Sequence, residues 1–485
     1  MHAHGITLLG LGPGDPALLT MQAWEVIQDL SEIYLRSRQH PTVAGFPSGL
    51  KVKSFDHLYA NGESFESVYA QIVDQVLDLG RRPEGVVYAV PGHPFIAEAT
   101  SPEIAKQARG QGIPIRVVEG ISFIESVFAA LEVDPFPQSA LVDALELGMT
   151  HHPLFPPSMP AIIAQIYSPR VASEVKLTLM AQYPDEYPVK LVHGAGSLHP
   201  QVEALSLYEI DRSAQIGLQT SLYIPPLNQD TSFESFQELV AHLRAPEGCP
   251  WDREQTHQSL RPHLLEEAYE VLAALDADDP EALSEELGDL MLQIVLHAQI
   301  ATEYGEFRMV DVLQHIHQKL VYRHPHVFGE VEVAGKDEVI ANWERLKAAE
   351  REVEGKSDPG GILRGVATAL PALTQAQTYQ KRAARVGFDW PNIAGVLEKI
   401  EEEIKEVSQA PDSRERFLEV GDLLFAVVNL ARWLNVDSES ALREANSRFR
   451  RRFEYIEASA RSQNRELSEY TLEEMDDLWE EAKKS

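Results

Sequence analysis

An acidic pattern, Glu-Glu-x-x-Glu followed downstream by Glu-x-x-Asp, occurs twice in the second half of this 485-residue sequence. The first copy reads LLEEAYEV (264–271) and EELGDLMLQIVLHA (285–298); the second reads IEEEIKEV (400–407) and LEVGDLLFAVVNLA (418–431). Residues three apart share one face of a helix, so each copy predicts four carboxylates converging from two helices. They repel one another unless a cation lies between them, and an all-oxygen ligand set favours Mg²⁺ or Mn²⁺. The pattern therefore indicates metal-assisted chemistry on a phosphate-bearing substrate.

The predicted ligands align between the two copies and define a sequence repeat. They are Glu267, Glu270, Glu286 and Asp289 in the first copy, and Glu403, Glu406, Glu419 and Asp422 in the second. Further along, VLQHIHQKLVYRH (312–324) aligns with ALREANSRFRRRF (441–453), which places Lys319 over Arg448 and Arg323 over Arg452. Acidic groups for a metal and basic groups for phosphate are the charges that a nucleoside triphosphate site needs.

Composition limits the classes of function. The length allows about three domains, and no apolar run approaches the roughly 20 residues that span a bilayer. The start of the chain lacks the features of a secretion signal, and the single cysteine, Cys249, excludes an internal disulfide. We therefore expect a cytoplasmic protein. A net charge of −33 opposes binding to nucleic acid or anionic membranes but permits a small phosphorylated substrate bridged by metal.

The chain is expected to contain an α/β domain followed by helices. Strand-like runs at 6–12, 85–92, 115–120, 161–167 and 190–196 alternate with helical stretches such as 19–30 and 65–80, which predicts a mostly parallel sheet over residues 1–228. Beyond a linker-like segment at 224–232, long amphipathic helices predominate. We divide them into one unit over 229–350, a linker over 351–361 and a second unit over 362–485.

The helical half resembles the MazG nucleoside triphosphate pyrophosphohydrolases. The resemblance rests on CPWDREQTHQSLRPHLLEEAYEV, EELGDLMLQIVLHAQ, KLVYRHPHVFG, QKRAARVGFDW and GDLLFAVVNLARWL, and it spans about 233–485. It implies an all-α fold, hydrolysis of nucleoside triphosphates to monophosphates and pyrophosphate, Mg²⁺ held by the acidic motifs, and a homodimer or higher homo-oligomer. Glu266 and Glu402 complete the motifs and are expected to orient water or a second metal.

This resemblance assigns roles to particular residues. Glu267 or Glu403 would position or deprotonate the attacking water, and four basic residues would stabilise the phosphates: Lys319, Arg323, Arg448 and Arg452. We favour the second unit as the better phosphate site, although two working sites remain open. Lys381 and Arg382 are further phosphate candidates or plain exposed charges. Trp251 and Trp390 are expected either to stack on a nucleotide base or to have a structural role.

Four histidines cluster at His315, His317, His324 and His326. They allow a zinc site, but without a nearby cysteine we prefer a structural interpretation.

The first half carries glycine-rich turns where a ligand can approach the backbone. The spacing of Gly10, Gly12 and Gly14 does not match the dinucleotide fingerprint. Together with VVYAVPGHPFIAEAT (86–100) and VEGISFIESVFAALEVD (118–134), this segment resembles the tetrapyrrole (corrin/porphyrin) methylases, which bind S-adenosylmethionine between two α/β subdomains. The matching positions are Gly10, Gly12, Pro13, Gly14, Asp15, Pro91, Gly92, His93, Pro94, Gly120, Ile121 and Ser122.

Two departures from the methylase pattern, His93 within its second motif and Glu119 before Gly120, leave S-adenosylmethionine binding expected and a tetrapyrrole acceptor in doubt. The whole arrangement, methylase-like then MazG-like, is similar to YabN-type fusion proteins. The leading hypothesis is a Mg²⁺-dependent nucleoside triphosphate pyrophosphohydrolase with a methyltransferase-like domain. One alternative is primarily a methyltransferase with a helical half for assembly, and another is a module that senses nucleotide without turnover.

Overall fold

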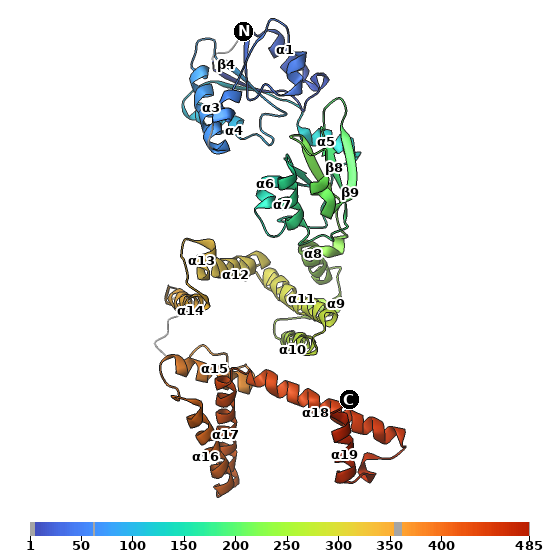
Figure 1. The fold of residues 1–485 in the computed structure, drawn as a ribbon, viewed down its shortest axis with the longest axis vertical. Helices are drawn as coiled ribbons and strands as arrows, with labels where there is room; N and C mark the ends of the chain where they lie inside the picture. The colour runs from blue at the N-terminus through green and yellow to red at the C-terminus, as the bar shows by residue number, and fades with distance from the viewer. Residues whose placement is uncertain (1–4, 62–63, 354–360, 485) are drawn as a thin grey trace. The chain divides into compact units, whose positions relative to one another are not determined.

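The computed structural model describes residues 5–61, 64–353 and 361–484 (Figure 1). The chain divides into two compact units, Met1–Arg253 and Glu254–Ser485. Of the linker expected over 351–361, residues 354–360 lie outside the described part. No helix among the described residues is long and apolar enough to cross a membrane.

The first unit opens with a five-stranded parallel sheet in the order β3-β2-β4-β1-β5. Its strands are β1 (Ile6–Gly10), β2 (Glu32–Leu35), β3 (Lys51–Ser54), β4 (Val86–Val90) and β5 (Ile115–Val118). Its helices are η1 (Pro16–Leu18), α1 (Met21–Gln28), η2 (Pro41–Gly45), α2 (Asp56–Asn61), α3 (Phe65–Gly80) and α4 (Thr100–Gly110). The expected strands near 6, 85 and 115 and the expected helices are confirmed.

Both faces of this sheet are buried, as the apolar strands require. Leu8 packs with Ile72 of α3 and Ile104 of α4, whereas its neighbour Leu9 packs with Ile27 of α1 on the other face. Because the strands are parallel, β1, β4 and β5 end at one edge, and the loops after them carry the glycine-rich turns.

The second sheet of this unit has the order β6-β7-β10-β8-β9. Its strands are β6 (Ala140–Asp143), β7 (Ala161–Ala164), β8 (Pro188–His193), β9 (Gln201–Ser206) and β10 (Thr220–Ile224). The expectation of a mostly parallel sheet is wrong here, since only β6 and β7 pair in parallel and the other pairs are antiparallel. The remaining helices are α5 (Phe123–Leu131), α6 (Ala144–Gly148), α7 (Pro169–Leu179), η3 (Leu207–Arg212), η4 (Gln229–Thr231), α8 (Phe233–Arg244) and α9 (Pro250–Glu254).

The second unit contains only helices among its described residues. They are α10 (Arg261–Ala277), α11 (Pro280–Tyr304), α12 (Met309–Arg323), α13 (Pro325–Phe328), α14 (Lys336–Val353), α15 (Ala372–Arg385), α16 (Ile393–Gln409), α17 (Ser413–Trp433), α18 (Ser438–Ser462), η5 (Leu467–Glu469) and α19 (Leu472–Ala482). In each sequence copy, two helices that pack together carry the acidic motifs (α10 with α11, α16 with α17), and a third carries the basic residues (α12, α18). The expected all-α fold is confirmed.

Local signals fix where the acidic helices begin. The Asp279 side chain accepts hydrogen bonds from the first amides of α11, and Asp412 does the same for α17. Asn392 caps α16 by accepting from the Ala394 amide at 3.0 Å. These caps satisfy backbone donors that a helix start leaves free, and they set which faces of the helices carry the carboxylates.

Candidate active site

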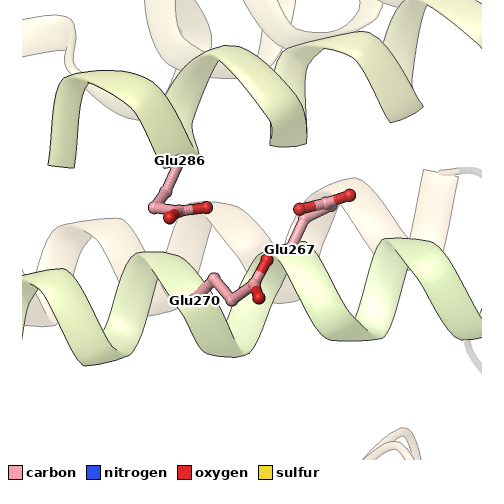
Figure 2. Close-up of side chains that lie close together, drawn as sticks. All are labelled: Glu267, Glu270 and Glu286. Carbon is pink, nitrogen blue, oxygen red and sulfur yellow. The ribbon is translucent and has the colours of Figure 1, made fainter. Parts of the chain in front are cut away.

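The first acidic set gathers three carboxylates between α10 and α11. Glu267 and Glu270 project from α10 and Glu286 from α11, as Figure 2 shows, and one oxygen of each lies within 4.8 Å of the others. Burial, the hydrogen bond with Glu270 and the charge of Asp289 raise the pKa of Glu267. Burial and the charge of Glu270 raise that of Glu286. Raised pKa values show that full ionisation is opposed until positive charge arrives.

The remaining predicted ligands of the first set lie at its margin. Asp289 is exposed and acts on Glu267 through its charge. Glu266 is directed elsewhere, with its carboxylate 3.6 Å from Nδ1 of His263.

The second acidic set also gathers three carboxylates, one from α16 and two from α17. One oxygen each of Glu403, Glu419 and Asp422 lie within 4.8 Å of one another. Burial and the charges of Glu406, Glu403 and Asp422 raise the pKa of Glu419. Glu406 thus acts on the set through its charge, while Glu402 pairs with Lys399 at 2.8 Å.

Glu403 is the most unusual member of either set. The residue is only 3% exposed, and its Oε2 has no hydrogen-bond partner. Its other oxygen, Oε1, lies 2.7 Å from Nζ of Lys399. A buried carboxylate oxygen without a hydrogen-bond partner is energetically costly. We therefore expect a bound ligand to supply the missing partner of Oε2.

A pocket of about 620 Å³ opens beside Glu403, which is within the range of small-molecule sites. Its walls are mainly apolar and aromatic, with a few polar groups. The lining residues are Leu363, Tyr379, Gln380, Ala383, Gly387, Phe388, Asp389, Trp390, Val396, Lys399, Glu403, Asp422, Phe425, Ala426, Asn429 and Arg432. Carboxylates beside an aromatic pocket match a phosphorylated ligand with a planar ring.

One wall of the pocket is held by a polar network. Arg432 donates to both carboxylate oxygens of Asp389, at 2.9 and 2.5 Å, and to Oδ1 of Asn429 at 2.9 Å. The indole of Trp433 also donates to Asp389, at 3.1 Å. This bidentate pair fixes the loop that carries Phe388 and Trp390.

Sequence reasoning did not identify Lys399, Tyr379, Phe388, Asn429 or Arg432 as site residues. The available signals were the family-like stretches QKRAARVGFDW, which contains Phe388 and directly follows Tyr379, and NLARWL, which contains Asn429 and Arg432. Lys399 lies one turn before the second acidic motif. Trp390, for which the sequence left base stacking and a structural role open, lines the pocket. Arg382 instead donates to the carbonyls of Ile362 and Arg364, at 3.1 and 2.8 Å.

The predicted phosphate-binding residues lie on α12 and α18, and the three arginines among them have local partners. Arg323 is paired with Glu350 and lies over the ring of Trp343. Arg448 pairs with Glu444 at 2.9 Å, and Arg452 lies 5.3 Å from the centre of the Trp479 ring. Lys319 is exposed. In the described part of the chain, none of the four is paired with a carboxylate of either acidic set.

The histidine cluster does not assemble three metal ligands among the described residues, where the two groups able to hold a metal contain carboxylates only. His315 and His317 are exposed on α12. His324 uses Nδ1 to contact the Leu320 carbonyl at 2.7 Å.

In the first unit, three glycine-bearing loops pack backbone against backbone at the edge of the parallel sheet. The amide of Gly12 donates to the Gly92 carbonyl at 3.2 Å, and the Gly92 amide donates back at 2.8 Å. A Cβ on Gly120 would lie 2.3 Å from the Gly92 carbonyl oxygen, and one on Gly10 would lie 2.6 Å from it. Only glycine leaves room for this close backbone contact, which explains why Gly10 and Gly120 are glycines.

A pocket of about 210 Å³ lies beside these loops, between the two sheets of the unit. Among the predicted cofactor positions, Pro13, Pro91 and Gly92 line it. The others support the loops: Asp15 caps η1, Ser122 caps α5, and Nδ1 of His93 accepts from the Phe95 amide at 3.1 Å. Gly14, Pro94 and Ile121 lie outside the lining.

Two side chains missed by sequence reasoning, His40 and Arg36, also line this pocket. His40 is buried, and burial lowers its pKa to about 4, so the imidazole is neutral near pH 7. Its Nδ1 has no partner.

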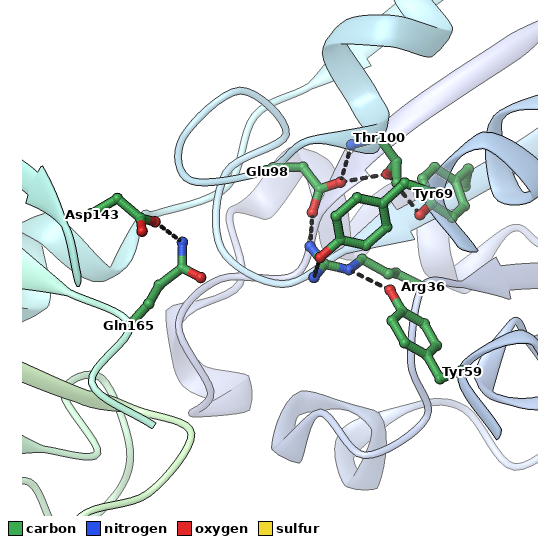
Figure 3. Close-up of polar contacts among 8 residues, drawn as sticks. Arg36, Tyr59, Tyr69, Glu98, Thr100, Asp143 and Gln165 are labelled. Carbon is green, nitrogen blue, oxygen red and sulfur yellow. Dashed lines mark hydrogen bonds and ion pairs between the residues drawn. The ribbon is translucent and has the colours of Figure 1, made fainter. Parts of the chain in front are cut away.

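Arg36 belongs to a partly buried polar cluster (Figure 3). It is paired with the buried carboxylate of Glu98 and donates to the hydroxyls of Tyr59 at 3.1 Å and Tyr69 at 3.3 Å. Glu98 also accepts from the amide of Thr100 at 2.9 Å. The guanidinium is therefore held rigidly at the pocket.

Comparison with known proteins places both halves in families. The model of the Tetrapyrrole (Corrin/Porphyrin) Methylases matches residues 5–211, and that of the MazG nucleotide pyrophosphohydrolase domain matches residues 255–328. The uncharacterized protein YabN of Bacillus subtilis is 41% identical over 99% of this chain and 98% of its own length. The nucleoside triphosphate pyrophosphohydrolase/pyrophosphatase MazG of Thermotoga maritima is 46% identical over 52% of this chain and 95% of its own.

Among solved structures, uroporphyrin-III-C-methyltransferase from Thermus thermophilus matches 46% of this chain and 93% of that chain. The sequence identity is 19% and the TM-score 0.36.

Proposed function

We propose a function from the premise that this chain belongs to the MazG family, in the fused form that carries a tetrapyrrole-methylase-like domain ahead of the MazG region. In our proposal the chain hydrolyses nucleoside triphosphates to nucleoside monophosphates and pyrophosphate, and requires Mg²⁺ or Mn²⁺. The name of the Thermotoga maritima relative supports the reaction class.

The buried, unpartnered oxygen of Glu403 beside the 620 Å³ pocket carries this proposal. It supports the unit over 362–485 as the principal site of hydrolysis. The unit over 229–350 also carries an acidic set and is proposed as a second cation site. Its candidate ligands are Glu266, Glu267, Glu270, Glu286 and Asp289.

The residues of the second set divide the work. Glu403, Glu419 and Asp422 would hold the cation, with Glu402 and Glu406 beside them. A bound cation would neutralise charge on the triphosphate and lower the pKa of a water molecule. Glu403 orients or deprotonates the attacking water, while Phe388 and Trp390 hold the base in the apolar pocket. Attack at a phosphorus then expels pyrophosphate.

We propose a homodimer or higher homo-oligomer, because the helices of the second unit expose large apolar side chains. Leu265 on α10 is 58% exposed, Met291 on α11 44% and Phe449 on α18 59%, a pattern typical of surfaces that a protein partner covers. A second copy would bring Lys319, Arg323, Arg448 and Arg452 to acidic sets with which, among the described residues, they form no ion pair. A monomer in analytical ultracentrifugation would contradict this.

Hydrolysis is tested by a screen of ordinary and damaged nucleoside triphosphates with Mg²⁺, in which pyrophosphate and monophosphate are both measured. We expect the two products in equal amounts. Absence of both from every substrate would exclude the proposed activity.

The acidic sets also predict a pH dependence of stability. The folded pKa values of Glu267, Glu286 and Glu419 are raised, so the folded chain binds more protons than the unfolded chain above about pH 4.5. These groups therefore destabilise the cation-free fold as the pH rises through their folded pKa values. Because cations replace the protons, we expect Mg²⁺ to raise the Tm more at about pH 7.5 than at about pH 5.

Calorimetric scans with EDTA or Mg²⁺ at both pH values measure this effect. A double variant, Glu267→Gln with Glu403→Gln, should lose most of the shift. An equal Mg²⁺ shift at both pH values would contradict a cation site built from these carboxylates.

A second proposed function is S-adenosylmethionine binding in the first unit. His40 favours it, because its buried, unpartnered Nδ1 faces a pocket lined by the loop residues Pro13, Pro91 and Gly92. Calorimetric titration should give one site, and Gly92→Val should abolish binding, since Gly92 has a φ of +66° that a β-branched residue opposes. No heat with the wild-type chain would rule out the site.

A further inference from the structure

Lys399 gives the second acidic set an internal counter-ion. It lies on α16, one turn before the Glu-Glu-x-x-Glu motif, and its Nζ is 2.8 Å from Glu402 and 2.7 Å from Glu403. The Glu402 and Glu403 carboxylates, acting mainly through their hydrogen bonds, raise the pKa of Lys399, so it remains charged at neutral pH. The charged ammonium of Lys399 is therefore in contact with Glu403, which is a proposed cation ligand.

The equivalent position in the first set holds His263, one turn before Glu267. Its Nδ1 is 3.6 Å from Glu266, the carboxylate directed away from the cluster. Among the described residues, no basic side chain is paired with Glu267, Glu270 or Glu286. The first set groups Glu267, Glu270 and Glu286, and the second groups Glu403, Glu419 and Asp422. The two sets therefore differ at one ligand position as well as in the internal counter-ion.

A cation that enters the second set must compete with Lys399 for Glu403. The ammonium already satisfies Oε1, and its charge opposes a second positive charge at the same carboxylate. A nucleoside triphosphate changes this balance, because its phosphates offer Lys399 an alternative partner within the pocket that it lines.

We propose that Lys399 makes cation binding at the second set conditional on the nucleoside triphosphate, whereas the first set binds a divalent cation by itself. In the empty site Lys399 pairs with both Glu402 and Glu403 and offsets one of their two negative charges. When the triphosphate arrives with its cation, the ammonium moves from Glu403 to a phosphate oxygen, and both oxygens of Glu403 become available. Lys399 is thus a positioning residue that couples the two ligands.

This inference rests on the proposed function and is tested by binding rather than turnover. The full chain with Glu267→Gln and Glu270→Gln isolates the second set. Free Mn²⁺ is then counted by electron paramagnetic resonance, with and without the α,β-methylene analogue of ATP, in this background and with Lys399→Gln or Lys399→Met added.

Removing the ammonium should tighten Mn²⁺ binding without nucleotide by about tenfold, and weaken binding of the analogue in the presence of Mn²⁺ by about tenfold, each equivalent to about 1.4 kcal/mol. Lys399→Arg should keep the original pattern. His263→Gln, made at the matching position of the first set in the otherwise wild-type chain, should leave binding of the analogue unchanged.

Unchanged or weaker Mn²⁺ binding in both Lys399→Gln and Lys399→Met would overturn the inference while leaving the proposed function intact. Failure of the proposed function has a different signature, because Mn²⁺ binding with the analogue would then be insensitive to Glu403→Gln. That result would remove the cation site and the coupling together.

Discussion

Glu403→Gln is expected to lower nucleoside triphosphate pyrophosphohydrolysis by about 100-fold or more, equivalent to at least about 2.7 kcal/mol of transition-state stabilisation. Glutamine preserves the volume of a residue that is 3% exposed, but it removes the negative charge that would hold the cation and orient water. The measurement is the steady-state rate of pyrophosphate release with saturating Mg²⁺.

Two matched variants show whether the effect belongs to this carboxylate. Glu401→Gln alters an exposed acid on the same helix and should leave the rate within about twofold, as surface changes usually do. Glu267→Gln changes the equivalent residue of the first set and should retain most of the activity. If Glu267→Gln abolished hydrolysis while Glu403→Gln did not, the assignment to the second unit would be wrong.

Arg36→Ala is expected to destabilise the first unit by about 3 kcal/mol. The side chain of Glu98 is 1% exposed, and losing its partner strands a buried negative charge, which typically costs about 3–5 kcal/mol. The low end applies because the side chain of Arg36 is 23% exposed and the amide and hydroxyl of Thr100 remain as donors to Glu98. The change in the free energy of unfolding is measured by urea titration, with hydrogen exchange of the β4 amides as the readout for the first unit.

The exposed pair of Arg81 and Asp78 provides the control for this prediction. Their side chains are 52% and 76% exposed, so Arg81→Ala should cost less than about 1 kcal/mol. Glu98→Gln should cost less than Arg36→Ala, because it removes the buried charge itself. Equal effects of Arg36→Ala and Arg81→Ala would show that the buried pair contributes no more than a surface one.

Periodicity alone was sufficient to predict that carboxylates of the two motifs meet in each copy, whereas Asp289 and Glu406 lie outside the two groups. Glu267 and Glu270 share a helix face by spacing, and the same holds for the ExxD motif on the next helix, so the meeting of the carboxylates followed once the helices paired. The strands that contain Leu8 and Val90 could also be predicted from the sequence, because apolar runs that end in glycine are typical of buried parallel strands.

The direction of the strands in the second sheet could not be predicted. The run around Ile163 is as apolar as a parallel strand, yet β7 pairs antiparallel with β10 and parallel with β6. Strand direction depends on how distant segments connect, and β10 (Thr220–Ile224) was not predicted as a strand, since the predicted linker begins at its last residue.

The pocket beside Glu403 was also beyond sequence reasoning. Its walls combine the segment around Tyr379 and Trp390 with residues such as Asn429 from α17, which meet only in the folded unit. The local partners of the basic residues could not be predicted either: Arg323 and Arg448, predicted to stabilise phosphates, pair with Glu350 and Glu444.

The central claim is that the second unit cleaves nucleoside triphosphates to monophosphate and pyrophosphate through a carboxylate-bound cation. Product analysis of the wild-type chain and of Glu403→Gln, with Mg²⁺ and with EDTA, tests it most directly. We predict equimolar monophosphate and pyrophosphate from the wild-type chain with Mg²⁺, and about 100-fold less from the variant or in EDTA. Release of diphosphate and orthophosphate, or a fully active Glu403→Gln variant, would contradict the account.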